Sequence, residues 1–490
     1  MVGKNMNLYF GEIHTHTGLS DGRGEPADAV AVGKAHLDFC ALADHAQSPD
    51  LPDFDEWESA RDRYAGWREA VPGVKARWHE VQALMRANYE PGRFVTFLAQ
   101  EWSSMRWGDH NIYYLRDDEP LRFASSLSEL YAAVEGVEAM VIPHHTAYPL
   151  HHRGVDWAEF DSAKGPVMEI FSRHGSSETE QGPFPYSGSA MGPRCAAGTA
   201  QRALELGHIV GFIASSDGHD SFPGSYNSGL AAVYAPALDR ESLWDALWQR
   251  RTYAVTGDRI RLDFGLNGRP MGRVISVGDG QPRRIEIGVD GWDCLDRVEI
   301  IKNGRVVKRW AGFDLERGGG AGRFKVGVEW GYHAFPEERK WSFSVETSGG
   351  SMAGYQTCFQ PPGFHQARDS GPRRLDISST TGGKRGGALP QRVDLDVVGT
   401  LETEVAIRND GEWVLQASVG ELLGESMVSM PFGVYGGAFY LSRAVAEAHF
   451  RAGLEWQDTK FERQRDYYYV RVFQRNGQAA WSSPIWVERA

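Results

Sequence analysis

The sequence is poor in cysteine, with four in 490 residues. Cys40, Cys195, Cys294 and Cys358 lie far apart and form no C-x-x-C pair, which excludes a disulfide framework and a thiolate zinc knuckle. No apolar run approaches the roughly 20 residues that a membrane helix needs. The N-terminus shows no basic segment followed by a long apolar one, so no signal peptide is expected. We therefore expect a cytoplasmic protein with no membrane partner.

Positive charge is also scarce, because 52 Lys and Arg residues face 65 Asp and Glu residues, for a net charge of −13. This balance argues against a nucleic-acid partner, whose phosphates demand a basic face. It is compatible with carboxylates gathered around metal ions, and with a small-molecule substrate. A homo-oligomer is also compatible with the sequence. The length predicts two or three domains.

What the chain does have is an H-x-H pair, His14 and His16, directly after the apolar run that ends at Ile13. Side chains alternate faces along a strand, so the two imidazoles point the same way. Side by side at a strand end, they can share one divalent metal. The alternative is a pair of surface histidines on an edge strand.

The pattern of an apolar run ending in polar side chains recurs along the first half of the chain. The runs end at Asp44-His45, Glu101, His144-His145, Glu169 with Arg173-His174, and Asp217 with His219. Helical segments alternate with these runs, which indicates a β/α barrel or a doubly wound sheet. In a barrel, catalytic groups gather at the C-terminal strand ends.

The character of the chain changes near residue 257. Residues 258–490 alternate polar and apolar positions, and Asn303-Gly304 is a hairpin signal, so we expect a β-sandwich-like domain there. Within it, Gly, Arg and Ser enrichment predicts a long loop over about 370–391. Residues 1–257 form the predicted barrel domain, with a helical insertion over about 53–89 that Pro72-Gly73 divides into two helices.

Together these strand ends supply imidazoles and carboxylates but no thiolates, a set that suits Mn, Zn or Fe. The predicted metal ligands are His14, His16, Asp21, His45, Glu101, His110, His144, Asp217 and His219. A carboxylate can bridge two ions, so a multinuclear site with two or three divalent metals is expected. Such ions can hold a bridging hydroxide nucleophile, which is a hydrolase arrangement. Asp44, His145 and Glu169 could instead orient ligands through hydrogen bonds.

As an ordered set these residues resemble the PHP superfamily, named for polymerase and histidinol phosphatase. The likeness rests on His14-x-His16 with Ser20-Asp21-Gly22, Ala43-Asp44-His45, Glu101, His110, Pro143-His144 and Asp217-x-His219. It covers roughly the first half of the chain. The segment around Arg259 and the ending Ala-Trp-Ser-Ser-Pro-Ile-Trp resemble a branch that is a domain of unknown function. The resemblance implies a distorted seven-stranded β/α barrel with up to three metals.

The resemblance also implies a division of the ligands among the metals. One metal takes His14, His16, Glu101 and Asp217; a second shares Glu101 and takes His110 and His144; a third takes Asp21, His45 and His219. The third set departs from the family pattern, because Asp stands where some members place a His. His174 has no firm family counterpart, and it could be an extra ligand or a proton donor to the leaving group.

The characterised members of the family are mostly phosphoesterases, so we expect a metal-dependent hydrolase of a small phosphomonoester or phosphodiester. A phosphate needs cationic partners at an acidic site, and arginine offers two parallel donors. Arg23, Arg153, Arg173 and Arg194 fall in the expected loops, and His145, Arg173 and His174 are the candidate catalytic residues. Two alternatives stay open: the same site acting on an amide, lactone or other ester, and a catalytically silent binding module.

Overall fold

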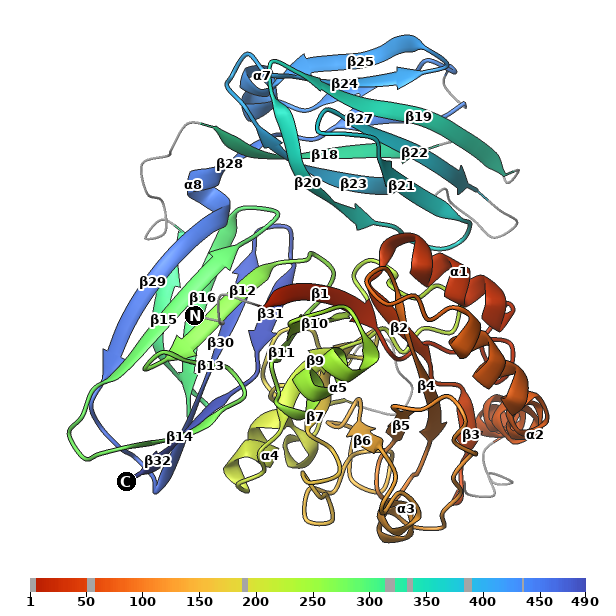
Figure 1. Cartoon of the computed structure of the whole chain (residues 1–490), viewed down its shortest axis with the longest axis vertical. Coiled ribbons are helices and arrows are strands. Elements are labelled where there is room, and N and C mark those ends of the chain that lie inside the picture. The colour runs from red at the N-terminus through yellow and green to blue at the C-terminus, as the bar shows by residue number, and fades with distance from the viewer. Residues whose placement is uncertain are drawn as a thin grey trace.

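Figure 1 shows the computed structural model of the chain, a mixed α/β fold that is rich in strands. The structure describes residues 6–490 apart from 51–57, 187–192, 313–321, 333–337, 383–389 and 434–435, and the side chains of 58–71 also lie outside the description. The expected mixed α/β class is confirmed.

One sheet of 14 strands runs through the molecule and joins both halves of the chain. Its strands are β1 (Asn7–Glu12), β2 (Phe39–Leu42), β3 (His45–Gln47), β4 (Val95–Trp102), β5 (His110–Tyr114), β6 (Ala139–Pro143), β10 (Leu230–Ala235), β11 (Thr252–Val255), β14 (Val274–Val277), β16 (Leu295–Lys302), β17 (Arg305–Ala311), β30 (Arg465–Gln474), β31 (Ala479–Ser482) and β32 (Ile485–Arg489). Strands β1, β2 and β4 are parallel, whereas β5 and β6 continue the sheet antiparallel. On the other side, β10 and β11 follow β1 antiparallel.

A separate three-stranded sheet completes the first half. It consists of β7 (Val167–Ser172), β8 (Gly175–Ser176) and β9 (Gly211–Ala214), with β7 and β9 parallel. Strand β7 lies beside β6 and β9 beside β11, but no backbone ladder joins these neighbours among the described residues. The strands therefore curve around a shared interior without closing a hydrogen-bonded ring in the described part of the chain.

Helices cover the outside of these strands. They are α1 (Pro26–His36), α2 (Glu58–Ala87), α3 (Leu127–Ala133), the short 3₁₀ helix η1 (Ala196–Gly198), α4 (Ala200–Glu205) and α5 (Arg240–Trp248). Side chains of Ser126, Thr199 and Asp239 cap the starts of α3, α4 and α5 by accepting a backbone N–H.

The predicted break at Pro72-Gly73 is wrong, because α2 continues through Pro72 as one helix. Proline in a helix interior costs a hydrogen bond and is strongly unfavourable by local propensity alone. Here the helix is supported after the proline by buried apolar side chains on one face. These are Val74, Trp78, Val81 and Met85, all of which belong to the main core.

The remaining strands form three further groups. One sheet contains β12 (Arg261–Leu266), β13 (Arg269–Pro270), β15 (Arg283–Asp290) and β29 (Arg451–Asp458). A second contains β18 (Arg323–Gly331), β20 (Ser351–Cys358), β23 (Gln391–Val398), β26 (Met427–Ser429), β27 (Ala438–Leu441) and β28 (Val445–Ala446). A third contains β19 (Arg339–Ser348), β21 (His365–Asp369), β22 (Arg374–Thr381), β24 (Glu404–Asn409) and β25 (Glu412–Ser418). Two short helices, α7 (Val419–Gly424) and α8 (Glu447–Phe450), accompany them.

The last two of these sheets bury one core between them and form a two-sheet unit at the top of Figure 1. Val326 and Val393 come from one sheet, and Phe343 and Ile377 from the other. Alternation of apolar and polar residues along each strand produces this arrangement, since every second side chain faces inward.

Two local predictions for the second half have opposite outcomes. The Asn303-Gly304 hairpin is confirmed: both residues have positive φ, 48° and 78°, between β16 and β17. The predicted loop over 370–391 is wrong in part, because β22 runs through it; residues 383–389 lie outside the described part. In β22, the polar residues Arg374, Asp376 and Ser378 alternate with the buried Leu375 and Ile377, which weakened the apolar signal.

The last strands of the chain return to the first half. Residues Tyr253 to Val255 of β11 pair with β31, and β31 pairs in turn with β30. The large sheet thus runs without interruption from β1 to the C-terminal strands. No helix in the described ranges is both long and apolar enough to cross a bilayer.

Candidate metal centre

Two chain segments meet where β1 and β9 end, and they set the centre's position. Thr15 forms a bridge with Gly218; the His16 N–H donates to Gly218 O over 2.8 Å, and the Asp217 N–H donates to His14 O over 3.0 Å. Because residues on either side of Thr15 share one face, His14 and His16 both reach Asp217. The H-x-H geometry predicted from alternation is thus present.

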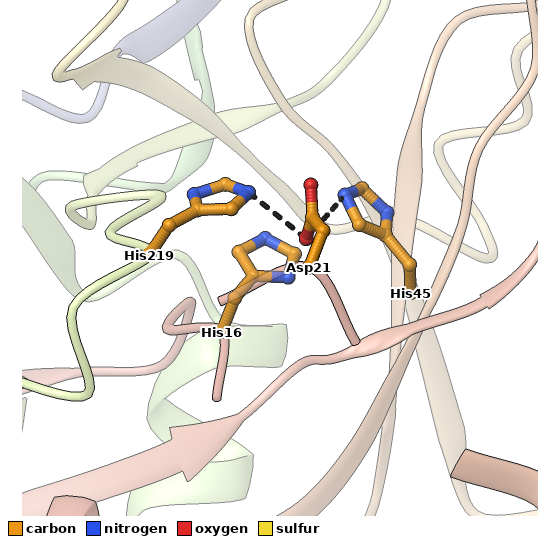
Figure 2. A group of neighbouring side chains, drawn as sticks. All are labelled: His16, Asp21, His45 and His219. Carbon is orange, nitrogen blue, oxygen red and sulfur yellow. Dashed lines mark ion pairs between the residues drawn. The ribbon is translucent and has the colours of Figure 1, made fainter. Parts of the chain in front are cut away.

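An outer histidine cluster forms from His16, Asp21, His45 and His219, and Figure 2 shows these side chains converging. Oδ1 of Asp21 lies 3.3 Å from Nε2 of His219 and 3.6 Å from Nε2 of His45. The ring of His16 stacks on that of His219 with centroids 4.2 Å apart. Each residue offers a ligand atom within 4.8 Å of the others.

An inner cluster lies deeper and consists of His14, His16, Glu101 and Asp217, all buried. Nε2 of His14 and Nε2 of His16 are 3.2 Å apart. Oδ1 of Asp217 lies 3.5 Å and 3.2 Å from these two nitrogens, and Oε2 of Glu101 lies 3.6 Å and 3.2 Å from them. Four ligand atoms therefore face one another across nearly equal distances.

These distances match those expected around one cation. Ligand atoms bound tetrahedrally at about 2.1 Å lie about 3.4 Å from each other. Two imidazole nitrogens that face one another at 3.2 Å cannot both carry a proton, so at least one of them is unprotonated and has a lone pair that can bind a cation. The inner cluster therefore fits a divalent metal by both spacing and donor chemistry.

Glu101 connects the two clusters. Its Oε2 lies 3.1 Å from Nδ1 of His45, and its Oε1 lies 3.3 Å from Nε2 of His144. The register explains this reach, because His45 in β3 lies directly beside Glu101 in β4 and shares its face. One carboxylate thus touches histidines on three sides, as a bridging ligand would.

His144 follows β6 and forms a third grouping with His14 and Glu169. Glu169 Oε2 lies 3.1 Å from Nδ1 of His14, on the ring edge opposite the inner cluster. A carboxylate in that place fixes the ring and leaves Nε2 to bind a cation. Burial raises the pKa of Glu169 to about 7, against the opposing effect of His14.

His110 is not brought into the clusters. In the β4–β5 ladder, Asn111 lies opposite Glu101 and His110 lies opposite Trp102, so His110 points to the other face of the sheet. Its ring is 6.1 Å from that of Trp102, and its Nδ1 lies 3.1 Å from Gly108 O. Burial lowers the pKa of His110 to about 4. The structure therefore does not place His110 beside Glu101 and His144, and its buried Nε2 has no hydrogen-bond partner among the described residues.

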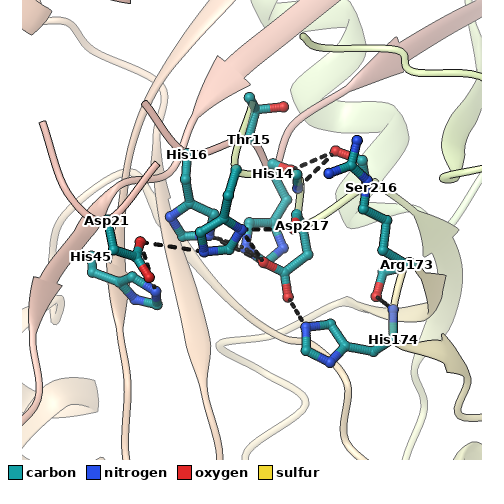
Figure 3. A network of polar contacts seen from close by, with 12 residues as sticks. His14, Thr15, His16, Asp21, His45, Arg173, His174, Ser216 and Asp217 are labelled. Atoms are coloured by element: carbon teal, nitrogen blue, oxygen red, sulfur yellow. Dashed lines mark hydrogen bonds and ion pairs between the residues drawn. The ribbon is translucent and has the colours of Figure 1, made fainter. Parts of the chain in front are cut away.

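The candidate catalytic residues line one side of the clusters. Nε2 of His174 lies 2.9 Å from Oδ2 of Asp217, and its Nδ1 lies 2.6 Å from the Tyr148 hydroxyl. Figure 3 shows His174 reaching Asp217 from the side opposite His16. Arg173 is one-third exposed and pairs with Asp220 at 2.6 Å. His174 thus connects Tyr148 with Asp217 through its two ring nitrogens.

His145 and Arg153 converge on Asp109, a residue that sequence analysis missed. Oδ2 of Asp109 lies 3.3 Å from Nε2 of His145 and accepts from Arg153 Nε over 2.5 Å. Arg153 Nη2 also approaches Glu101 Oε1 at 3.8 Å. In the sequence, only the position of Asp109 directly before His110 pointed to the site. A single carboxylate in a polar loop is weak evidence for such a role.

The other candidate arginines are placed differently. Arg194 donates to the carbonyls of Ser176, Gly182 and Pro183, so it ties a loop together. Arg23 is exposed, and its N–H donates to His219 O. Of the four arginines named from sequence, Arg153 and Arg173 are the two that lie against the clusters.

Glu12 was also missed, although it stands two residues before His14. It is fully buried and accepts from the hydroxyls of Thr15 and Ser216 and from the Gly224 N–H. It thereby holds the loop that carries Asp217. Asp44 has a similar role, accepting from the Thr17 N–H and the Ser20 hydroxyl beside Asp21.

Several buried ligand atoms have no hydrogen-bond partner among the described residues. They are Nδ1 of His16, both ring nitrogens of His144 and of His145, Oε2 of Glu101 and Oε1 of Glu169. Such atoms each cost about 1–3 kcal/mol when left unsatisfied in a protein interior. Burial also lowers the pKa of His144 and of His145 well below the usual range, which favours the neutral imidazole that binds metals.

The backbone is strained at the same place. His145 and Asp217 have φ values of 30° and 52°, in the left-handed region that non-glycine residues seldom adopt. Strain of this kind costs about 1–3 kcal/mol and persists where the surroundings enforce it. Asp217 belongs to the inner cluster and His145 lies beside the clusters. The orientation of these two side chains therefore lowers the stability of the fold.

The sequence of this chain is similar to a family of unknown function and to uncharacterised proteins. Residues 223–269 match the family described as "Protein of unknown function (DUF3604)". An uncharacterized protein of Chlamydia pneumoniae is 36% identical over 197 residues, which cover 37% of this chain and 31% of the relative. One from Chlamydia muridarum is 35% identical over 193 residues, covering 36% and 31%. The matched part thus spans about a third of these relatives' length, and the matches fit the expected branch of unknown function.

Among solved structures, the chain is similar to a two-domain protein from Bacteroides vulgatus that contains a predicted PHP-like metal-dependent phosphoesterase. The superposition covers 85% of this chain and 95% of that chain, with a TM-score of 0.33 and 12% sequence identity.

Proposed function

We propose that this chain is a metal-dependent hydrolase of small phosphomonoesters or phosphodiesters. The observation that carries the proposal is the inner cluster, in which His14, His16, Glu101 and Asp217 offer ligand atoms 3.2–3.6 Å apart in a buried site. The residues come from distant parts of the chain, and a buried polar cluster of this kind is unstable without a cation to satisfy it. The PHP resemblance of the same residues supports the hydrolase class.

The proposed ligand sets follow the observed groupings. One metal would be held by the inner cluster, which includes Nε2 of His16, and a second by Asp21, His45 and His219 of the outer histidine cluster. A third position would use His144 with Glu101 and Glu169, without His110. Mn, Zn and Fe all suit imidazole and carboxylate ligands. When bound, such ions would act as Lewis acids and lower the pKa of water.

The chain's own residues would then complete the reaction. His174 would donate a proton to the leaving oxygen, and its hydrogen bond with Tyr148 would hold the ring in position. Arg173 would bind a phosphate oxygen, because its side chain is one-third exposed although it also pairs with Asp220. Arg153 would stay bound to Asp109 and orient His145.

We also propose that the two halves of the chain have different roles. Residues 1–257 would carry the site in a distorted, PHP-like barrel, with the segment about 53–89 as an insertion over one side. Residues 258–490 would brace this barrel, with the two-sheet unit as a β-sandwich. The continuous large sheet supports the bracing role, since β30 and β31 extend it beyond β11.

Metal content and turnover test the proposal together. Elemental mass spectrometry should detect divalent metal in the purified chain. The chain should also hydrolyse an aryl phosphate, and this activity should be lost on chelation and restored by Mn²⁺. His14→Ala and Asp217→Asn should lose both metal and turnover while keeping the wild-type circular dichroism spectrum. His79→Ala, at an exposed helix position, is the matched control and should keep both.

The outcome also separates the alternatives. Metal binding with turnover of an amide or lactone, and no phosphoester turnover, would replace the phosphoester assignment. A folded chain that binds no divalent metal would refute the hydrolase proposal itself.

A further inference from the structure

A polar cleft lies on the two-sheet unit, away from the clusters described above. It encloses about 590 Å³ on the outer face of the sheet β21–β22–β19–β24–β25. The opposite face of these strands carries the apolar core, including Phe343, Val345 and Ile377. A volume of this size falls within the range of ligand sites in proteins.

The strand register sets five side chains in one row across the cleft. Arg368 lies opposite Asp376, Asp376 opposite Ser344, Ser344 opposite Arg408, and Arg408 opposite Trp413. Directly opposed residues share a face, so all five point outward together. The row crosses five strands, a span of about 19 Å.

The two arginines of the row form no close ion pair with a described carboxylate, although the charge of Arg368 helps to lower the pKa of Asp376, which lies opposite it. Arg374, beside the row, pairs with Asp376 at 2.8 Å and with Glu346 at 2.9 Å. By contrast, neither Arg368 nor Arg408 forms an ion pair with any residue that the structure describes. The Nε of Arg408 is buried and has no acceptor among those residues, and its guanidinium lies 3.9 Å from the ring centre of Trp413.

Hydroxyl and amide groups fill the space between the charges. Gln366, Ser378 and Ser342 form a second row beside the first, and Ser344 lies 3% exposed at the floor. Trp413 is 50% exposed at one end. The cleft thus combines guanidinium forks, small hydroxyls and a few carboxylate acceptors, and the half-exposed Trp413 lies beside its lining with Arg408 over one face of the ring.

We propose that this cleft binds an acidic saccharide chain whose sugars carry carboxylates. A planar carboxylate matches the guanidinium fork of Arg368 or Arg408. Sugar hydroxyls need both donors and acceptors, which Ser342, Ser378 and Asp376 supply, and the apolar face of a sugar ring can pack on Trp413. A nucleic acid fits less well, because Asp376 and Asp410 in the lining would repel its phosphates.

The charge of the whole chain makes this face unusual. The chain carries a net charge of −13, yet this cleft is lined by Arg368, Arg374 and Arg408 against Asp376 and Asp410. With Glu346, which pairs with Arg374, charges of the two signs balance here, so this face is less acidic than the chain as a whole. The unsatisfied Nε of Arg408 can then attract an anion, and the interspersed hydroxyls select one that also carries hydroxyls.

Calorimetric titration of the full chain with tetragalacturonate tests the proposal. We expect binding that weakens as salt rises, and binding of maltotetraose, the neutral comparison, about tenfold weaker or more. Arg368→Ala and Arg408→Ala should each raise Kd about tenfold or more, and Trp413→Ala should also weaken binding. Arg284→Ala, an exposed arginine on β15 in another sheet, is the matched control and should leave Kd unchanged.

Arg368 and Trp413 are exposed and Arg408 is partly buried, so thermal melting should show folded variants, and aryl phosphatase activity should stay at the wild-type level. The proposal is overturned if the wild type does not bind tetragalacturonate, or if it binds maltotetraose or a DNA oligomer equally well. It is also overturned if the Arg368 and Arg408 variants bind like the wild type.

Discussion

Glu101 and His110 lie on neighbouring strands of one sheet but on opposite faces of it. Asn111 is the residue directly opposite Glu101, whereas His110 lies opposite Trp102. A shift of one residue along a strand moves a side chain to the other face. The side chain of His110 therefore points away from the sheet face that carries Glu101, although the two residues are close in the sequence.

This relationship predicts different results for two substitutions. Glu101→Gln should weaken metal binding at least about 100-fold, because Glu101 contacts histidines of both clusters. His110→Asn should keep the wild-type metal content and lose only thermal stability, since its ring is buried beside Trp102. Metal analysis and melting temperatures of both variants check this. Loss of metal from the His110 variant would return this residue to the ligand set.

The contacts of His174 predict a defect in turnover without a defect in metal binding. His174→Gln should lower kcat about 100-fold or more, as removal of a general acid does, while metal content and KM change little. Tyr148→Phe should lower kcat less, because it only removes the 2.6 Å contact that holds the ring. His208→Gln, a half-buried histidine that donates to Trp157 O, serves as the control. Joint loss of metal and turnover in His174→Gln would show that His174 is a ligand.

Much of the site could be anticipated from local sequence, for a physical reason. Apolar runs that end in His, Asp or Glu put those side chains at strand ends, and strand ends converge when strands share an interior. His14, His16, His45, His144, Asp217 and His219 follow this rule, whereas Asp21 lies in a turn well after the end of β1. Asp109 could not be identified this way, because its role depends on Arg153, far away in the chain. Glu12 does end β1, but its contact with Ser216 could not be anticipated from local sequence.

The fold was less predictable than the site. Local patterns indicated strands and helices, but the pairing of β31 with β11 joins residues more than two hundred positions apart. No local signal specifies such a pairing, and its selection depends on how the whole core packs. The same holds for α2, where tertiary packing outweighs the propensity of Pro72.

The contact between α1 and the two-sheet unit predicts a pH-dependent stability. His36 Nε2 donates to Pro223 O over 2.8 Å, and its ring lies among Phe222, Phe359 and Arg259. Burial, with a contribution from Arg259, lowers the pKa of His36 to about 3, and burial lowers the pKa of His365 to about 4.

In the unfolded chain both histidines would have a pKa near 6.5. Below that pH the unfolded state binds more protons, so the free energy of unfolding should fall by up to about 1.4 kcal/mol per pH unit for each histidine. Above pH 6.5 both histidines are neutral in either state, and this contribution to stability is fully present. Urea unfolding at pH 7.5 and pH 5 should show a smaller pH difference for His36→Gln than for the wild type. An equal difference would contradict the assignment.

The pairing of β11 with β31 predicts that residues 1–257 will not fold alone. Without the C-terminal strands, β11 would expose a free edge at Tyr253 to Val255. It would also lose Trp481, which is fully buried and stacks at 6.0 Å on Phe171 of β7. The expressed fragment 1–257 should therefore be insoluble or unfold without cooperativity, as judged by circular dichroism in urea.

The intact chain offers a finer version of this test. Trp481→Ala should cost about 3–5 kcal/mol of unfolding free energy, the range found for large aromatic side chains removed from a core. Trp413→Ala should cost far less, because that side chain is half exposed. Cooperative folding and metal binding by the fragment 1–257 would show that the first half has its own complete core. In that case, the C-terminal strands would be an addition to the large sheet and not a requirement for it.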